Sequence, residues 1–167
     1  MEFTHFDKNG NAVMVDVTEK SDTVREALAA GLIQVSEKVY AAVKEGSVKK
    51  GDVLAVAATA GIMGAKKTAE LIPMCHILPL TGCRVWFEME PETCRIYCFC
   101  EVKITGKTGV EMEALTGVST ALLTVYDMCK AIDKTMEIGQ IHLCRKTGGR
   151  SGTVVNGLQN KSEGQPV

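Results

Sequence analysis

The alternation of apolar and polar positions is clearest near the middle of the chain, where it predicts two paired strands. Over residues 94–105 every second side chain is apolar, and most of the side chains between them are polar or charged. This period of two is typical of a strand with one buried face. A second run, residues 84–90, precedes it, and Pro91 and Glu92 between the two favour a tight turn. The pattern therefore predicts a β-hairpin.

A period of three to four residues predicts the longest helix, over residues 109–134. Apolar side chains that recur at this spacing form one continuous stripe: Leu115, Val118, Leu122, Val125, Cys129 and Ile132. Polar side chains form a second stripe: Glu113, Thr116, Thr120, Thr124, Asp127, Lys130 and Lys134. We therefore expect one face of this helix to pack on the core and another to make polar contacts.

Weaker patterns predict the remaining elements. Residues 36–45, which end before a glycine, and the alanine-rich residues 51–71 indicate two more helices, and Gly61 and Gly64 in the second point to close packing. Strands are expected at 11–17 and 138–145. Residues 24–35 fit either a capped helix or a strand, and we favour a strand. A hairpin among mixed elements favours an α+β fold with a mainly antiparallel sheet packed against helices.

Size and composition indicate one domain. The 167 residues, with 46% hydrophobic and 23% charged side chains, can form a core without disulfides or metal. We assign residues 1–152 to a single domain. The glycine-rich stretch that follows has little to bury, so residues 153–167 are expected to form a mobile tail.

Charge and cysteine usage narrow the class of protein. The 19 basic and 20 acidic residues argue against nucleic-acid and membrane-surface binding. No apolar run is long enough to span a bilayer, and the first residues lack the apolar segment of a signal peptide. Seven cysteines without a Cys-x-x-Cys pair are expected to be reduced. These features together predict a cytoplasmic protein.

Candidate chemistry begins on the longest helix. Asp127 and Lys130 are three residues apart, so they share a face and form a usable acid–base pair, although a solvated surface ion pair explains the same spacing. Glu111 and Glu113 are two apart and diverge on a helix. One of them could contact a ligand, with Glu113 the better candidate, or both could complement the helix dipole.

Two other segments could bind a ligand. Met74, Cys75 and His76 lie in a loop between two prolines, where His76 could exchange protons or could merely be packed. The glycine-rich segment 146–152, with cations at Lys146 and Arg150, could close over a phosphate but lacks a Walker-A pattern. The scattered carboxylates and histidine have no metal-ligand spacing, so no metal site is predicted.

Seven segments, in the same order along the chain, resemble the family of cyclic pyranopterin monophosphate synthases, the C proteins of molybdenum-cofactor biosynthesis. Two of them, 107–116 and 124–131, carry the family's signature helix. The others are 14–17, 23–27, 50–53, 71–76 and 146–152. Their collinearity makes the resemblance specific over residues 14–152.

The resemblance implies a lyase reaction. Its substrate is a cyclised dihydro-GTP, (8S)-3′,8-cyclo-7,8-dihydroguanosine 5′-triphosphate, and its products are cyclic pyranopterin monophosphate and pyrophosphate. The rearrangement includes several proton transfers but no redox step, so no cofactor is required. Whether Mg²⁺ accompanies the phosphates stays open. A non-catalytic nucleotide- or pterin-binding oligomer derived from the family is the alternative.

The resemblance also implies roles for individual residues. The catalytic groups would be Asp127, Lys130 and Lys50. The substrate-binding groups would be Met74, Cys75, His76, Met112, Glu113, Glu111, Arg25, Lys66 and Lys146. The chain departs from the family at Ile77, where a proline typically follows the histidine. This departure motivates the non-catalytic alternative.

The resemblance further implies a ferredoxin-like subunit in a homohexamer, a trimer of dimers. Its sites would lie between subunits and would take a small nucleotide substrate. Close packing of the helix around Gly61 and Gly64 on a neighbouring subunit would fit such an assembly.

Overall fold

Five strands form a single antiparallel sheet in the order β2–β3–β1–β4–β5. The computed structural model describes residues 6–49 and 51–156. Along the chain the elements are β1 (Thr23–Gln34), α1 (Glu37–Lys44), α2 (Val53–Lys66), α3 (Thr68–Leu71), β2 (Gly82–Glu90), β3 (Arg95–Gly106), α4 (Glu111–Cys129), β4 (Glu137–Thr147) and β5 (Val154–Val155).

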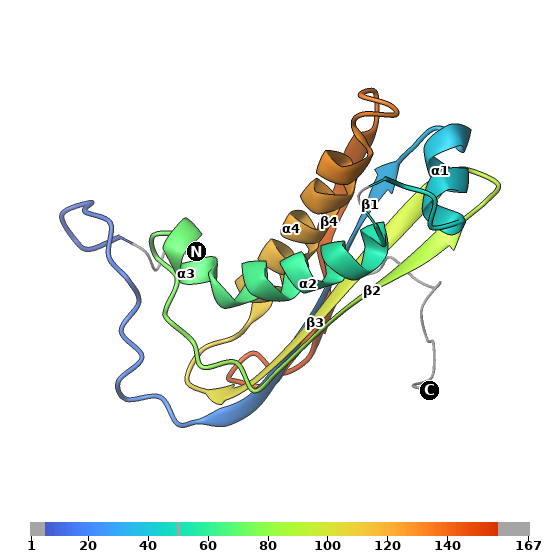
Figure 1. Cartoon of the computed structure of the whole chain (residues 1–167). Coiled ribbons are helices and arrows are strands. Elements are labelled where there is room, and N and C mark those ends of the chain that lie inside the picture. Colours follow the sequence, from blue (N-terminus) through green and yellow to red (C-terminus); the bar gives the residue numbers. More distant parts are fainter. Residues whose placement is uncertain (1–5, 50, 157–167) are drawn as a thin grey trace.

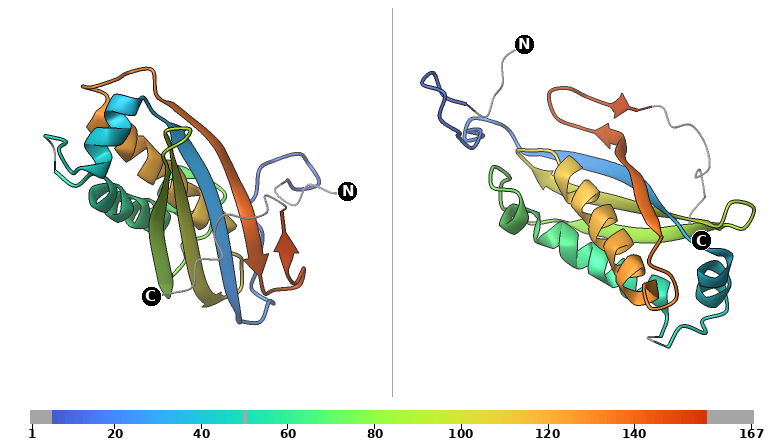
Figure 2. Two further views of the ribbon diagram at one scale, coloured as in Figure 1. Left: turned by 90° about the vertical axis from the view of Figure 1, so that its right-hand side faces the viewer. Right: turned by 90° about the horizontal axis from the view of Figure 1, so that it is seen from above.

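The helices α2 and α4 cover one face of this sheet, as the two views in Figure 2 show. The order β1–α2–β2–β3–α4–β4, with β1 and β3 central in the sheet, is the ferredoxin-like arrangement. The predicted α+β class is therefore confirmed (Figure 1). Among the described helices, none combines the length and apolar character needed to cross a membrane.

The ambiguous segment 24–35 forms the central strand β1. It pairs along its length with β3 on one side and β4 on the other. Ala27, Ala29 and Ile33 are almost fully buried under the helices. A strand with two neighbours forms backbone hydrogen bonds on both edges. These bonds explain why the segment forms a strand and not the capped helix that the pattern at Thr23–Glu26 also allowed. The predicted hairpin is also present, with its turn at residues 91–94.

Glycines bring α2 and α4 into close contact. A Cβ atom at Gly61 would lie 2.9 Å from the backbone oxygen of Gly117, and one at Gly64 would lie 2.3 Å from Thr120 Oγ1. On α4, a Cβ at Gly117 would lie 2.5 Å from Cys100 Sγ on β3. The predicted close packing thus takes place within the chain. The glycines need no neighbouring subunit to explain them.

Three predicted boundaries are wrong. Residues 11–17 are extended, but their segment contributes only an isolated bridge between Phe6 and Ala12, because it lies outside the sheet. The helix expected over 51–71 breaks at Lys67, whose ψ of 12° separates α2 from α3. The helix α4 ends at Cys129, five residues early, and a turn follows in which the amide of Ile132 donates to the backbone oxygen of Cys129.

Beyond β4 the chain turns back and forms β5, which no sequence pattern indicated. Val154 pairs with Lys146, and Val155 pairs with Arg145. Residues 157–167, most of the expected mobile tail, lie outside the described residues.

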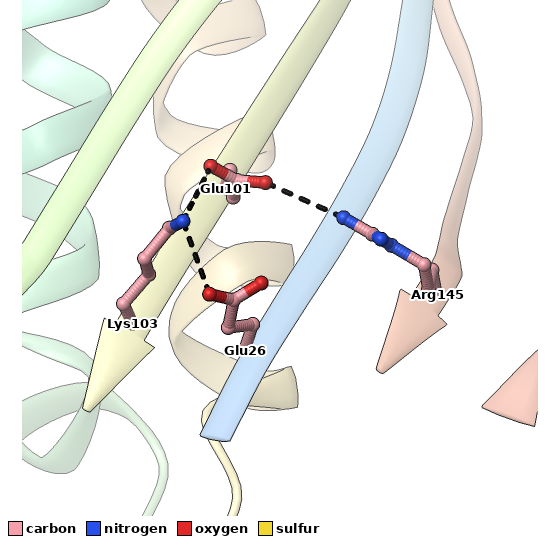
Figure 3. Close-up of polar contacts among 4 residues, drawn as sticks. All are labelled: Glu26, Glu101, Lys103 and Arg145. Carbon is pink, nitrogen blue, oxygen red and sulfur yellow. Dashed lines mark ion pairs between the residues drawn. The ribbon is translucent and has the colours of Figure 1, made fainter. Parts of the chain in front are cut away.

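The sheet face away from α2 and α4 carries an ion-pair network across three strands (Figure 3). Lys103 Nζ on β3 lies 3.0 Å from Glu26 Oε1 on β1 and 3.6 Å from Glu101 Oε2. The other carboxylate oxygen of Glu101 lies 3.5 Å from Arg145 Nη2 on β4. Next to it, Trp86 stacks on Phe99 with ring centroids 5.3 Å apart. This face is therefore polar and aromatic, whereas the helix-covered face is aliphatic.

The contact between Gly117 and Cys100 makes a packing prediction. Gly117→Ala should lower the free energy of unfolding by about 1–3 kcal/mol, because the new methyl group overlaps the sulfur of Cys100. In a Cys100→Ala background the same substitution should cost much less, because the sulfur is gone. Denaturant unfolding of the four chains at one protein concentration measures this. An equal cost in both backgrounds would contradict the assignment.

Candidate active site

A basic pocket lies where the start of β1, the end of β3 and the end of β4 meet. Its volume is about 560 Å³. Five cations and one carboxylate are among its lining residues: Lys20, Arg25, Lys107, Lys146, Arg150 and Glu111. Backbone and hydroxyl groups of Ser21, Thr23, Thr108, Gly109, Gly149 and Ser151 complete the lining. A pocket with this excess of positive charge favours a polyanion such as a triphosphate.

Arg25 is held rigidly in this pocket. Its Nε donates to the backbone oxygen of Gly106 and its Nη2 to that of Lys107, both at 3.0 Å. The loop after β4 lies directly against it, since a Cβ at Gly149 would be 2.0 Å from Arg25 Nη1. Only glycine permits this approach, and Gly149 also has a positive φ of 70°. The glycine-rich segment 146–152, which the sequence predicts could close over a phosphate, thus lies at the basic pocket.

A second, much smaller pocket surrounds Glu113 at the start of α4. Its lining includes Lys66 at the end of α2 and His76 in the loop before β2, together with Ile77 and Leu78. Its volume of about 20 Å³ has room for about one water molecule. The Nε2 atom of His76 donates to the backbone oxygen of Val15 at 2.9 Å, which fixes the ring. We call this space the glutamate pocket.

Glu113 is buried, with 4% of its surface exposed. Burial raises its pKa to about 7, with a smaller contribution from the negative charge of Glu111, while a backbone hydrogen bond opposes the shift. A carboxyl group with a pKa near neutrality can both accept and donate a proton at physiological pH. Burial and the charge of Glu113 also raise the pKa of the Cys75 thiol, so that thiol stays protonated.

The first turn of α4 connects the two pockets. Glu111 lines the basic pocket and Glu113 lines the glutamate pocket. The two carboxylates diverge, as expected for residues two apart on a helix. A ligand with a phosphate end and a ring end could therefore contact both pockets across this turn.

Asp127 and Lys130 lie at the other end of α4. Lys130 Nζ is 2.6 Å from Asp127 Oδ1, and both side chains are more than half exposed. The pair raises the pKa of Lys130, first through the hydrogen bond to Asp127 and then through its charge. Fourteen residues of helix at 1.5 Å per residue separate Asp127 from Glu113 by about 21 Å. One chain therefore does not bring this pair to the glutamate pocket.

The other expected site residues are distributed as follows. Met74 and Cys75 lie, half-buried, in the loop that carries His76, and Met112 is exposed in the first turn of α4. Lys50 lies outside the described residues. Within the residues that the structure describes, no three His, Cys, Asp or Glu side chains gather as metal ligands would.

Two pocket-lining cations were not singled out as candidate site residues from the sequence: Lys20 and Lys107. Lys107 could have been found, because it directly precedes the signature helix. No sequence pattern indicated Lys20 as a pocket residue, because it lies in a polar segment whose path the sequence does not predict. In the structure Lys107 Nζ donates to the backbone oxygen of Thr18 at 2.7 Å, which ties that segment to the pocket.

A ferredoxin-like fold with a polyanion pocket beside a buried, protonatable carboxylate is typical of the class of proteins that bind a phosphorylated small molecule and can exchange protons with it. A family model described as "MoaC family" matches residues 14–149. This chain belongs to the MoaC family, as its resemblance to the C proteins of molybdenum-cofactor biosynthesis had indicated.

Its relatives are similar over nearly their whole length. A protein of Clostridium botulinum (strain Alaska E43 / Type E3) named cyclic pyranopterin monophosphate synthase is 59% identical, with 93% of this chain and 98% of the relative covered. Proteins of the same name from Natranaerobius thermophilus and Thermoanaerobacter pseudethanolicus are 56% and 53% identical. The matches cover 93% and 91% of this chain, and 98% and 96% of those relatives.

The pKa of Glu113 predicts how stability depends on pH. In the unfolded chain Glu113 loses its proton near 4.5, whereas in the folded protein it keeps it up to about 7. The folded state binds more protons between these values, so the free energy of unfolding falls as pH rises from about 4.5 to about 7.

Glu113→Gln should remove this part of the pH dependence, which denaturant unfolding at pH 5 and pH 7.5 (roughly the two sides of the window) would measure. Glu111→Gln is the matched control, because it removes a carboxylate from the same helical turn and should leave most of the slope in place. An unchanged slope in Glu113→Gln would contradict the raised pKa.

Proposed function

We propose that this protein is a cyclic pyranopterin monophosphate synthase, a lyase of molybdenum-cofactor biosynthesis. It converts (8S)-3′,8-cyclo-7,8-dihydroguanosine 5′-triphosphate to cyclic pyranopterin monophosphate and releases pyrophosphate. The names of relatives 53–59% identical over almost the whole chain support this function. The structural observation that carries it is the first turn of α4, which joins a pocket for polyphosphate to a pocket for proton exchange.

The basic pocket would hold the triphosphate. Arg25 and Lys146, with three further cations of the pocket, can neutralise the substrate and the leaving pyrophosphate. Because Arg25 is already fixed by two backbone carbonyls, its charge needs little reorganisation during the reaction. We propose that these side chains supply the positive charge and that no resident cofactor is required.

The part of the substrate that rearranges would lie against the glutamate pocket, whose own volume has room for about one water molecule. Glu113 can take up and return a proton near neutral pH, and Lys66 and His76 line the same space. Cys75, which precedes His76 in the loop, keeps its thiol protonated because burial and the charge of Glu113 raise its pKa. The loop stays anchored despite Ile77, because the amide of Cys75 donates to Ile72 and His76 is bound to Val15. The side chain of Ile77 is 90% exposed. The replacement of the family's proline by Ile77 therefore does not favour a non-catalytic oligomer.

We propose that Asp127 and Lys130 act in a site completed by a second subunit. Within one chain the pair is exposed and lies about 21 Å from Glu113 along the helix axis. A homohexamer built as a trimer of dimers would place the end of α4 from one subunit at the pockets of another. Lys50, two residues before Asp52 (the N-cap of α2), would act with this pair. We place the enzyme in the cytoplasm, in keeping with its seven free cysteines.

Asp127→Asn should lower turnover by at least about 100-fold, because the amide cannot exchange a proton as the carboxylate does. Pyrophosphate release and the mass of the pterin product, measured after incubation with the cyclised triphosphate, report this. Glu70→Gln is the control, since Glu70 forms an exposed ion pair of the same spacing with Lys67 and lines neither pocket. Full activity of Asp127→Asn would remove Asp127 from the mechanism.

The shared site predicts complementation between subunits. Chains carrying Asp127→Asn and chains carrying Glu113→Gln should each be inactive alone. Mixed oligomers, isolated through a different tag on each chain, should regain part of the activity, because some sites combine an intact Glu113 with an intact Asp127. Mixed oligomers that form but stay inactive would contradict a site built from two subunits while leaving the reaction itself unaffected.

A further inference from the structure

A cysteine and a histidine that neither pocket uses lie side by side on β4. His142 and Cys144 are two residues apart, and Leu143 between them packs against the core. Side chains alternate along a strand, so His142 leaves the opposite face of the sheet, the one that carries the ion-pair network. Cys144 Sγ lies 3.4 Å from His142 Nε2, which places both side chains on that face. Both residues are partly buried.

The imidazole of His142 is oriented by the backbone. Its Nδ1 lies 2.6 Å from the carbonyl oxygen of Gln140, a residue with a positive φ of 53°. A carbonyl oxygen only accepts hydrogen bonds, so Nδ1 carries the ring proton and Nε2 presents its lone pair to Cys144. This arrangement, with the remote nitrogen bound to a carbonyl, is the one that metal-ligating histidines use.

The backbone beneath the pair is held in place. The amide of Asn156 donates to the oxygen of Cys144 at 2.9 Å, and its side chain donates to the oxygen of Leu143 at 3.0 Å. The pairing of β4 with β1 is also irregular here, with register shifts between Leu28 and Ala29 and between Ala30 and Leu32. Such irregularities re-aim side chains, and here they flank the cysteine and the histidine.

We propose that Cys144 and His142 form a two-residue chelate for a soft divalent metal ion of the zinc type. With metal–sulfur and metal–nitrogen bonds of about 2.3 and 2.0 Å at a tetrahedral angle, the two ligand atoms stand about 3.5 Å apart. The observed 3.4 Å is close to this ligand-to-ligand distance. Water or an external ligand fills the other coordination positions.

Metal binding exchanges one proton for one metal ion. The thiol of Cys144 loses its proton to solvent, the thiolate and the Nε2 lone pair bind the metal, and Nδ1 keeps its hydrogen bond to Gln140. A nucleophilic cysteine activated by histidine would use the same two residues. Only the chelate binds a metal ion with loss of the thiol proton, which distinguishes the two readings.

The test uses Co²⁺ as the probe, added to the full-length, reduced oligomer without chelator. We expect a thiolate-to-cobalt charge-transfer band in the near ultraviolet that saturates at no more than one ion per chain, with release of one proton per ion. Cys144→Ser should abolish the band, and His142→Ala should weaken binding by at least about 10-fold. Cys94→Ser is the matched control, because Cys94 is also partly exposed but bonds only to a backbone carbonyl.

Three results would overturn the proposal: no band in the unaltered protein, a band that survives in Cys144→Ser, or equal affinity in His142→Ala. Alkylation by iodoacetamide tests the alternative that Cys144 is a nucleophile activated by His142. Fast modification of Cys144 that slows in His142→Ala, without a cobalt band, would assign the pair as a nucleophile and reject the chelate. Pyranopterin synthesis should be equal in Cys144→Ser and the unaltered protein, since Cys144 lines neither pocket.

Discussion

The close approach of α2 to α4 is the contact on which the site depends. Because Gly61 and Gly64 have no side chains, the C-terminal half of α2 lies directly on the middle of α4. This contact brings Lys66 beside Glu113 and closes the space around that carboxylate. The raised pKa of Glu113 follows from the same packing, since its main cause is the loss of solvent. A helix pair with larger residues would stand further apart and would hydrate the carboxylate.

The length of α4 separates two groups of candidate site residues. The helix carries groups suited to proton transfer at both ends, and its length keeps them about 21 Å apart. A single chain therefore holds two separate groups of candidate residues, one at the two pockets and one at the exposed aspartate–lysine pair. Assembly of subunits would restrict the proposed reaction to the oligomer, where substrate is enclosed.

The two faces of the sheet serve different purposes. The face under α2 and α4 is aliphatic and forms the core, which fixes the strand ends around the basic pocket. The opposite face holds the charges of Glu26, Glu101, Lys103 and Arg145. It also holds the pair His142 and Cys144, which we propose as a metal chelate separate from the two pockets.

Local patterns were sufficient for much of the fold. The period-two alternation of residues 94–105 and the apolar stripe of the signature helix each reflect burial on one face, so they predicted β3 and α4 and, with the hairpin, the α+β class. Patterns failed where a distant or irregular contact decides the structure. The strand expected over residues 11–17 has a suitable pattern but no neighbouring strand, and β5 forms only because β4 offers its edge.

The site divides in the same way. The order of the motifs and the chemical types of the side chains were enough to identify the family and to select Arg25, Glu113, His76 and Asp127 as candidate site residues. Both features can be read directly from the sequence. Only the tertiary structure decided which of them share a pocket. The buried state of Glu113, the entry of Lys20 into the basic pocket and the distance to Asp127 depend on helix packing and loop paths. These are long-range contacts, and no local pattern of residues encodes them.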